Sequence, residues 1–166
     1  TGKLRSGDYY VDGGISSQFL TGLLLAFCLM DGESRLHILG TLQSAPYVTM
    51  TQGACALFGK NTDAFTVTGG GLRSPGRVNV EGDWSNAAFF LAAKALGSSV
   101  TVENLDPASS QGDRACASLL PELISSQLVI SAADIPDLVP ILAITAAASH
   151  GATFTDIQRP RLKESD

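Results

Sequence analysis

One arrangement recurs three times along the chain and most constrains its fold. A turn rich in Gly, Asp or Pro leads into an apolar helix, the helix ends at a glycine, and a segment that alternates like a strand follows. Such a recurrence predicts an α/β or α+β protein built from repeated units. Capping residues or proline near the helix starts, and glycine after their ends, favour the same assignment. The turns lie at 13–17, 81–85 and 134–137, the helices run to about residues 30, 96 and 150, and the predicted strands are 35–39, 99–103 and 153–157.

Two further helices are predicted at 46–58 and 113–123. The main helices carry apolar residues on most of their faces, so we expect them to be buried. Residues 69–76 (Gly-Gly-Gly-Leu-Arg-Ser-Pro-Gly) are the best linker candidate, which predicts a domain crossing between about Ser74 and Glu81. These glycines match no phosphate loop, because no Lys-Ser/Thr follows and no GxGxxG opens a helix.

The composition narrows the classes of partner. Apolar residues make up 45% of the chain and charged residues 16%, which is typical of a globular protein. The net charge of −5 argues against nonspecific nucleic-acid binding. The longest apolar run, 19–30, is too short to span a bilayer. The chain starts Thr-Gly-Lys-Leu-Arg without the apolar core of a signal peptide. We therefore expect a cytoplasmic protein with neither a nucleic-acid nor a membrane partner.

Cysteine and histidine usage indicates no metal site. Cys28, Cys55 and Cys116 are odd in number and widely spaced, with no CxxC pair and no histidine at ligand spacing. We expect them to be small buried hydrophobic residues in a reducing compartment. His37 and His150 are solitary, which does not favour a catalytic role.

Two clusters of hydroxyl groups begin predicted helices. Ser16-Ser17-Gln18 offers two hydroxyls and an amide where unpaired backbone N–H groups favour an anion, as a phosphate on a polyol would require. Ser44 and Tyr47, in Ser-Ala-Pro-Tyr, form a second such set. Each pattern is also typical of a plain helix cap, and the residues alone favour the cap over the anion site.

Acidic and cationic residues follow later in the chain. Asp137 stands in the first turn of a helix among apolar residues, where burial would raise the pKa of its carboxyl and suit it to proton abstraction. Arg159, Arg161 and Lys163 alternate, so they share one face of an extended segment, and Glu164 lies beside them. This segment suits an anionic ligand, although a charged end of this kind is also typical of a solvated terminus.

An ordered set of stretches carries a family resemblance and spans nearly the whole chain. No single triplet is specific, but the set in this order is. The stretches are Ser16 to Leu24, Ser44-Ala45-Pro46-Tyr47, Glu81 to Ala87, Gln111-Gly112-Asp113-Arg114, Ile135-Pro136-Asp137 and Arg161 to Asp166. Together they resemble the 5-enolpyruvylshikimate-3-phosphate synthase family of 3-phosphoshikimate 1-carboxyvinyltransferases in the chorismate pathway.

The resemblance implies a fold of two domains, each with three βαβαββ-like units, and substrates bound between them. Residues 1–79 would be the C-terminal part of one domain, and residues 80–166 an incomplete N-terminal part of the second. The implied reaction is addition of shikimate 3-phosphate to phosphoenolpyruvate through a tetrahedral intermediate, followed by elimination of phosphate. It requires no metal or organic cofactor, because fixed donors and cations can stabilise the developing charge.

The resemblance also implies roles for single residues. Asp137 matches the acceptor of the proton of the attacking 5-hydroxyl, and Glu164 a carboxylate that protonates the methylene of phosphoenolpyruvate. Arg159 joins the substrate-binding candidates, although many members have Asn there. The candidate ligands of shikimate 3-phosphate are Ser16, Ser17, Gln18, Ser44, Tyr47 and Lys163, with Gln18 also near phosphoenolpyruvate.

Two departures from the family shape the expectations. Family chains are more than twice as long, and both missing parts contribute to the phosphoenolpyruvate site, so we expect the isolated chain to be inactive. The stretch from Gln111 to Asp137 is shorter than usual, as if a strand hairpin between Leu123 and Ser131 were lost.

Two alternatives remain. The sibling enzyme that transfers enolpyruvyl to UDP-N-acetylglucosamine shares the fold but does not need the Ser-Ser-Gln and Ser-Ala-Pro-Tyr residues. A noncatalytic binding or assembly module is the other, and it would self-associate through apolar surface that truncation exposes.

Overall fold

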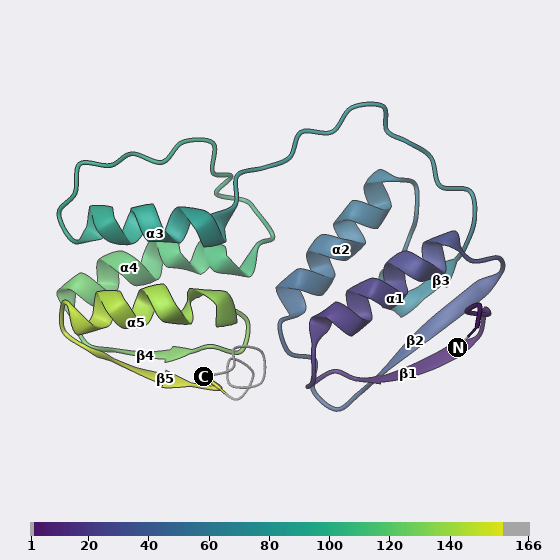
Figure 1. Cartoon of the computed structure of the whole chain (residues 1–166), viewed down its shortest axis with the longest axis horizontal. Helices are drawn as coiled ribbons and strands as arrows, with labels where there is room; N and C mark the ends of the chain where they lie inside the picture. Colours follow the sequence, from purple (N-terminus) through teal and green to yellow (C-terminus); the bar gives the residue numbers. More distant parts are fainter. Residues whose placement is uncertain (1, 158–166) are drawn as a thin grey trace. The chain divides into compact units, whose positions relative to one another are not determined.

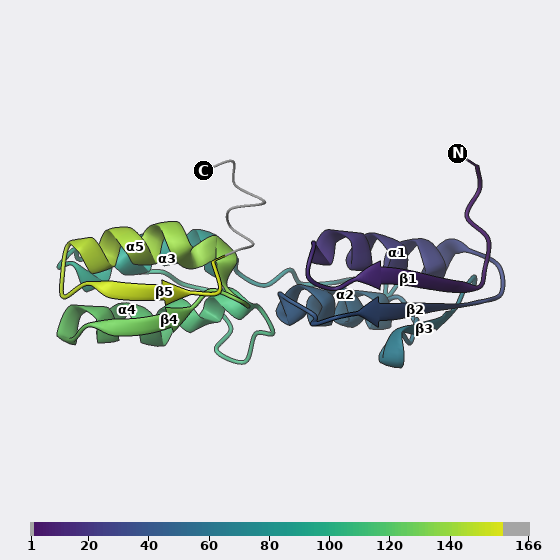
Figure 2. The ribbon, with the colours of Figure 1, turned by 90° about the horizontal axis from the view of Figure 1, so that it is seen from below.

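The computed structural model describes residues 2–157 and is a mixed α/β structure, which confirms the predicted fold class (Figure 1). The chain divides into two compact units, Thr1–Asn79 and Val80–Asp166. In each unit the helices lie on one side of a small sheet (Figures 1 and 2). That these units belong to two enolpyruvyl-transferase domains built from βαβαββ repeats stays a prediction.

The first unit has a three-stranded sheet with β2 in the centre. Strands β1 and β2 are parallel, with Tyr10 opposite His37, and β3 is antiparallel to β2, with Thr66 opposite Arg35. The elements in order are β1 (Asp8–Asp12), α1 (Ser17–Leu29), β2 (Glu33–Leu39), α2 (Ala45–Leu57), a 3-10 turn at Asp63–Phe65 and β3 (Thr66–Thr68).

The core of the first unit lies between its helices and the sheet. Leu20, Leu24 and Phe27 recur at the spacing of one helix face and are fully buried, together with Leu36 of β2 and Val67 of β3. The stability of α1 comes mainly from packing of this apolar stripe against the sheet, because helix propensity alone stabilises a short helix only marginally.

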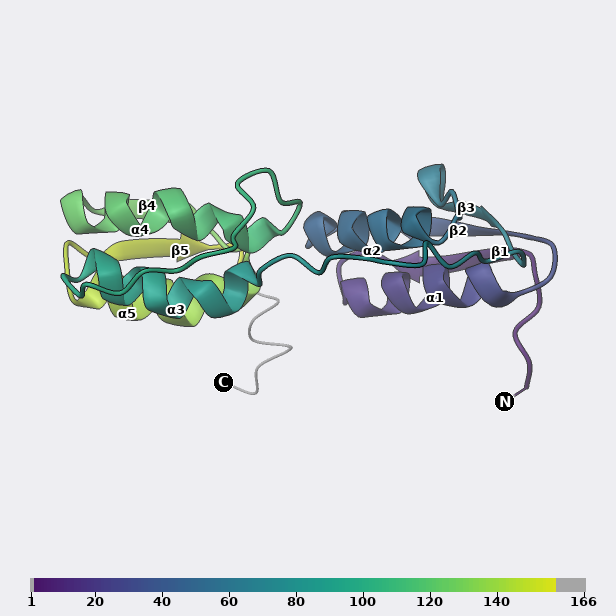
Figure 3. The same cartoon turned by 90° about the horizontal axis from the view of Figure 1, so that it is seen from above.

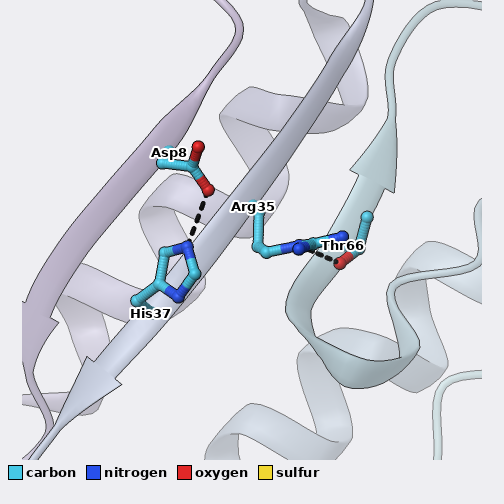
Figure 4. A network of polar contacts seen from close by, with 4 residues as sticks. All are labelled: Asp8, Arg35, His37 and Thr66. Carbon is cyan, nitrogen blue, oxygen red and sulfur yellow. Dashed lines mark hydrogen bonds and ion pairs between the residues drawn. The ribbon is translucent and has the colours of Figure 1, made fainter.

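The opposite face of this sheet is polar. The His37 ring lies 2.6 Å from the Asp8 carboxylate through Nε2 and Oδ1, and Arg35 Nε donates to Thr66 Oγ1 at 3.2 Å (Figure 4). Tyr10 stacks on His37. These pairs join neighbouring strands, so His37 has a structural role in the sheet.

The second unit packs three helices above two parallel strands. Strands β4 and β5 are connected through α5, with Ile130 opposite Phe154. Its core includes Trp84, Leu120, Leu138 and Leu142. The elements are α3 (Trp84–Ala95), a 3-10 turn at Gly112–Ala115, α4 (Cys116–Ser125), β4 (Leu128–Ser131), a 3-10 turn at Pro136–Leu138, α5 (Val139–Ala147) and β5 (Ala152–Thr155).

The start of α3 is capped from two places in the sequence. Asp83 Oδ1 accepts from the backbone N–H groups of Ser85 and Asn86, as the sequence indicates. The Gln111 side chain accepts from the Trp84 N–H and donates to the Gly82 carbonyl, at 2.8 and 2.9 Å. The buried Asp113 accepts from the Ser85 hydroxyl. The Gln-Gly-Asp stretch therefore helps to hold α3.

The predicted helices are confirmed, but the strands are only partly so. The predicted strand at 99–103 is wrong: that segment is extended but pairs with no other segment within residues 2–157. A segment with alternating side chains forms a β-strand only where a neighbouring strand exchanges backbone hydrogen bonds with it. Strand β5 ends at Thr155, because Asp156 has a φ of 56°. Strands β1, β3 and β4 were not predicted.

The expectation that the apolar helices are buried is correct for only part of their surface. Each keeps one apolar face exposed within its own unit, because nothing described in that unit packs against it. The exposed side chains are Phe19, Leu25 and Leu29 on α1, Phe89 and Phe90 on α3, and Ile144 on α5.

The three cysteines are buried and free, as predicted. Cys28 and Cys55 bring α1 and α2 together, with their sulfur atoms 3.7 Å apart. Among the helices formed by residues 2–157, none has the length and apolar character needed to cross a membrane.

Candidate functional site: two helix starts at one sheet edge

The N-termini of α1 and α2 meet at the carboxyl ends of the parallel strands β1 and β2. The Gly13 N–H donates to the Leu39 carbonyl at 2.9 Å, and the Gln43 N–H donates to the Gly13 carbonyl at 3.2 Å. A Cβ on Gly13 would lie 2.7 Å from Ile38 Cγ2 and 3.1 Å from Leu42 Cα, so the two turns need glycine there. The carboxyl edge of parallel strands is where α/β proteins commonly bind ligands.

Ser16, Ser17 and Gln18 begin α1, as the sequence predicts. Ser16 is the N-cap residue, and its Oγ accepts from the Gln18 N–H at 3.2 Å. Ser17 is buried and Gln18 is exposed. The cap interpretation is thus correct for Ser16, and it is compatible with an anion at the remaining N–H groups of the first turn.

Ser44 and Tyr47 begin α2 in an unusual conformation. Ser44 is the N-cap residue but is fully buried, and its φ of 53° and ψ of 44° are left-handed. Its side chain makes no capping hydrogen bond to the helix, whereas its carbonyl accepts from the Tyr47 N–H at 3.1 Å. Tyr47 is half-buried. A left-handed residue other than glycine costs free energy, and such residues cluster at functional sites.

Asp137 lies in the second unit, in the turn that precedes α5. It follows β4, so it too stands beyond the carboxyl end of a parallel strand. Its side chain is exposed, so the expectation that this carboxyl is buried among apolar residues is wrong for this structure. The surrounding apolar residues, Ile135 and Leu138, turn into the core instead.

Sequence reasoning missed a second carboxylate at this edge. Asp156 Oδ2 accepts from the hydroxyls of Ser131, at 2.7 Å, and Thr155, at 3.1 Å. These hydroxyls come from the last residues of β4 and β5. Asp156 fell inside the strand predicted at 153–157, so no sequence signal indicated that it lies just beyond the end of β5.

The structure brings together the two hydroxyl clusters but does not test every candidate. Ser16, Ser17, Gln18, Ser44 and Tyr47 lie on adjoining turns of one unit, while Asp137 belongs to the other unit. Arg159, Lys163 and Glu164 lie outside the described residues. Within the described part of the chain, no three His, Cys, Asp or Glu side chains are grouped so that they could hold a metal ion.

Comparison with known proteins identifies the family of the chain. Residues 2–127 match the model of the family described as EPSP synthase (3-phosphoshikimate 1-carboxyvinyltransferase). The chain belongs to the EPSP synthase family. Curated relatives named 3-phosphoshikimate 1-carboxyvinyltransferase share 38% identity in Clostridium kluyveri, 35% in Clostridium novyi and 37% in Methanocorpusculum labreanum.

The alignments with these EPSP synthases include nearly all of this chain but less than half of each relative. The three alignments include 99%, 99% and 100% of this chain, against 44%, 43% and 44% of the respective relatives. The chain therefore spans less than half the length of the curated EPSP synthases it matches.

Proposed function

We propose that this chain is a segment of a 3-phosphoshikimate 1-carboxyvinyltransferase, and that its first unit binds the phosphate of shikimate 3-phosphate. The observation that carries the proposal is the junction of two helix starts at one sheet edge, tied by the Gln43–Gly13 hydrogen bond. Helix N-termini present N–H donors and a positive dipole end, which suit a phosphate dianion. The hydroxyls of Ser16, Ser17 and Ser44 add short donors at the same edge.

The other candidates take the remaining roles in this proposal. Tyr47 and Lys163 contact shikimate 3-phosphate, as does Gln18, which also lies near phosphoenolpyruvate. Asp137 accepts the proton of the 5-hydroxyl, for which its exposed carboxylate is accessible. Glu164 protonates the methylene of phosphoenolpyruvate, and Arg159 is a further substrate contact.

The chemistry is an addition followed by an elimination. The 5-hydroxyl oxygen bonds to C2 of phosphoenolpyruvate while the methylene gains a proton, which gives a tetrahedral intermediate. Loss of that methyl proton and of phosphate then leaves the enolpyruvyl ether. In this proposal the reaction uses no cofactor. We also propose that the protein acts in the cytoplasm.

Calorimetric titration with shikimate 3-phosphate tests the binding site. The chain should bind the ligand, and Ser17→Ala should weaken binding by about tenfold, the effect of one charge-assisted hydrogen bond. Ser118→Ala, an exposed serine of α4, is the matched control and should change nothing. A folded chain that shows no binding, or prefers UDP-N-acetylglucosamine, would contradict the proposal.

A phosphate-release assay with both substrates tests the activity of the chain alone. We expect no turnover, because the chain spans under half of its relatives. Turnover by this chain would show that its site is complete.

Self-association is a second proposal, supported by the exposed apolar helix faces. Leu29 on α1 is 73% exposed, and Phe89 and Phe90 on α3 are more than half exposed. Apolar surface of this kind drives association. Light scattering should detect oligomers of the unmodified chain, and Leu29→Lys should lower the oligomer fraction. A chain that is monomeric at all concentrations would contradict this proposal.

A further inference from the structure

Two of the three cysteines meet inside the first unit. Cys28 lies in the last turn of α1 and Cys55 in the last turn of α2, and their Sγ atoms are 3.7 Å apart. The two helices lie side by side on the same face of the sheet (Figures 1 and 3). Cys116, the third cysteine, belongs to the other unit. The first unit therefore holds two thiols in direct contact, and such a pair can be oxidised to a disulfide.

Formation of this disulfide needs only a small displacement of the sulfur atoms. Bonded sulfur atoms are about 2.05 Å apart, so the Sγ atoms of Cys28 and Cys55 must approach each other by about 1.7 Å. Rotation of a cysteine side chain about χ1 moves its sulfur by distances of this order. The crosslink therefore requires a change of side-chain rotamer and no rearrangement of the two helices.

The two thiols are buried but lie close to the surface. Cys28 is 3% and Cys55 4% exposed, and Ala54 and Ala56, which flank Cys55 in α2, are exposed. An oxidant as small as hydrogen peroxide reaches such a pair through a local opening at the helix ends. Burial, and next the neighbouring Cys28 thiol, raise the pKa of the Cys55 thiol to about 11. Because the thiolate is the reactive form, Cys55 stays a thiol at neutral pH and reacts slowly.

A bond between these sulfur atoms would crosslink two helices that begin at the same sheet edge. The loop that it closes, residues 28–55, contains β2 and the turn before α2. Closing such a loop restricts the unfolded chain, which stabilises the folded unit. Other bonds hold the backbone at both cysteines, because the Cys28 carbonyl accepts from the Gly70 N–H at 3.0 Å and the Cys55 carbonyl from the Lys60 N–H at 2.9 Å. The side chains can therefore adjust while the helix ends stay in place.

We propose that Cys28 and Cys55 form a reversible redox switch, in which hydrogen peroxide converts the pair into a disulfide that joins α1 to α2 and a reducing thiol opens it again. The thiolate of one cysteine attacks the peroxide, the O–O bond breaks, and hydroxide leaves, which gives a sulfenic acid. The second sulfur then forms the S–S bond while the S–O bond breaks and water leaves. Overall, two thiols and one peroxide give one disulfide and two waters, and the sulfurs lose the two electrons that the peroxide gains. This inference does not depend on the proposed function.

Peptide mapping of the peroxide-treated chain tests the pairing. Trypsin cleaves after Arg35 and Lys60, so a digest without reductant should contain peptides 6–35 and 36–60 joined to each other. The intact chain should lose the mass of two hydrogen atoms, and dithiothreitol should restore it. Cys116 should remain a thiol and is the internal control. Oxygen addition at Cys28 and Cys55 without joined peptides, or a disulfide between two chains, would overturn the proposal.

Urea denaturation measures the effect of the disulfide on the fold. The first unit of the oxidised chain should unfold at a urea concentration about 1–2 M higher than in the reduced chain, and dithiothreitol should abolish the difference. Cys28→Ala and Cys55→Ala should each remove this shift, whereas Cys116→Ala is the matched control and should keep it. Where an alanine variant does not fold, the joined peptides of the unmodified chain still decide the pairing. An unchanged or lower midpoint after oxidation would contradict a crosslink that fits the folded unit.

Discussion

The Gln43 backbone N–H donates a hydrogen bond of 3.2 Å to the Gly13 carbonyl, and this bond joins the turns that start α1 and α2. Its formation depends on the close approach of Gly13 to the end of β2. This bond therefore holds together the two helix starts that form the candidate phosphate site.

Gly13→Ala should damage both stability and ligand binding. The new Cβ would lie 2.7 Å from Ile38 Cγ2 and 3.1 Å from the Leu42 Cα, so the backbone must move. We expect a loss of about 1–3 kcal/mol in the free energy of unfolding, measured by urea denaturation. Gly22→Ala is the control. It lies inside α1 with open space around it and should stabilise the protein by about 0.5–1 kcal/mol.

Ser44→Gly should separate stability from binding. Glycine adopts the left-handed conformation of Ser44 without strain, which should add up to about 1 kcal/mol of stability. The loss of the hydroxyl should nevertheless weaken binding of shikimate 3-phosphate. Ala64→Gly, with a φ of 49°, should relieve similar strain and leave calorimetric binding unchanged. Unchanged affinity in Ser44→Gly would remove Ser44 from the site.

Gln111→Ala should destabilise the second unit through the start of α3. It removes the acceptor for the Trp84 N–H and the donor to the Gly82 carbonyl, and Trp84 is buried. We expect a loss of about 1–3 kcal/mol in urea denaturation, against about 1 kcal/mol for the simple cap removal Asp83→Ala. A smaller loss for Gln111→Ala than for Asp83→Ala would mean that water replaces the amide.

Stability should fall in alkaline solution because of Cys116. Burial, and next the nearby Asp113 carboxylate, raise the pKa of the Cys116 thiol to about 11. The unfolded thiol titrates near 8.5, so the folded state holds this proton more tightly. The stabilisation is therefore complete below about pH 8.5 and is lost as the pH rises toward 11.

Urea denaturation between pH 7.5 and 10.5 measures this loss, which should be of the order of 1–3 kcal/mol. Cys116→Ala should flatten the profile. Burial also raises the pKa of the Cys55 thiol to about 11, so a second substitution at Cys55 should flatten it further. A double variant with the original alkaline slope would refute the role of the thiols.

Local sequence patterns were enough to place the helices. The Ser16 and Asp83 caps and the i, i+4, i+7 spacing of Leu20, Leu24 and Phe27 act within a few residues, so they can be read from the chain. The hydroxyl clusters at the helix starts were predicted in the same way. The family followed from their order along the chain, and the matching relatives confirmed it.

Tertiary structure decided what depends on distant partners. The alternation in 99–103 predicted a strand that does not form, because no other strand in the described range bonds to it. The exposure of Asp137 and the joining of the two helix starts by Gln43 and Gly13 also lay beyond local pattern. A helix closes its own hydrogen bonds, whereas a strand, a buried carboxylate or a shared sheet edge needs a neighbour that only the folded chain supplies.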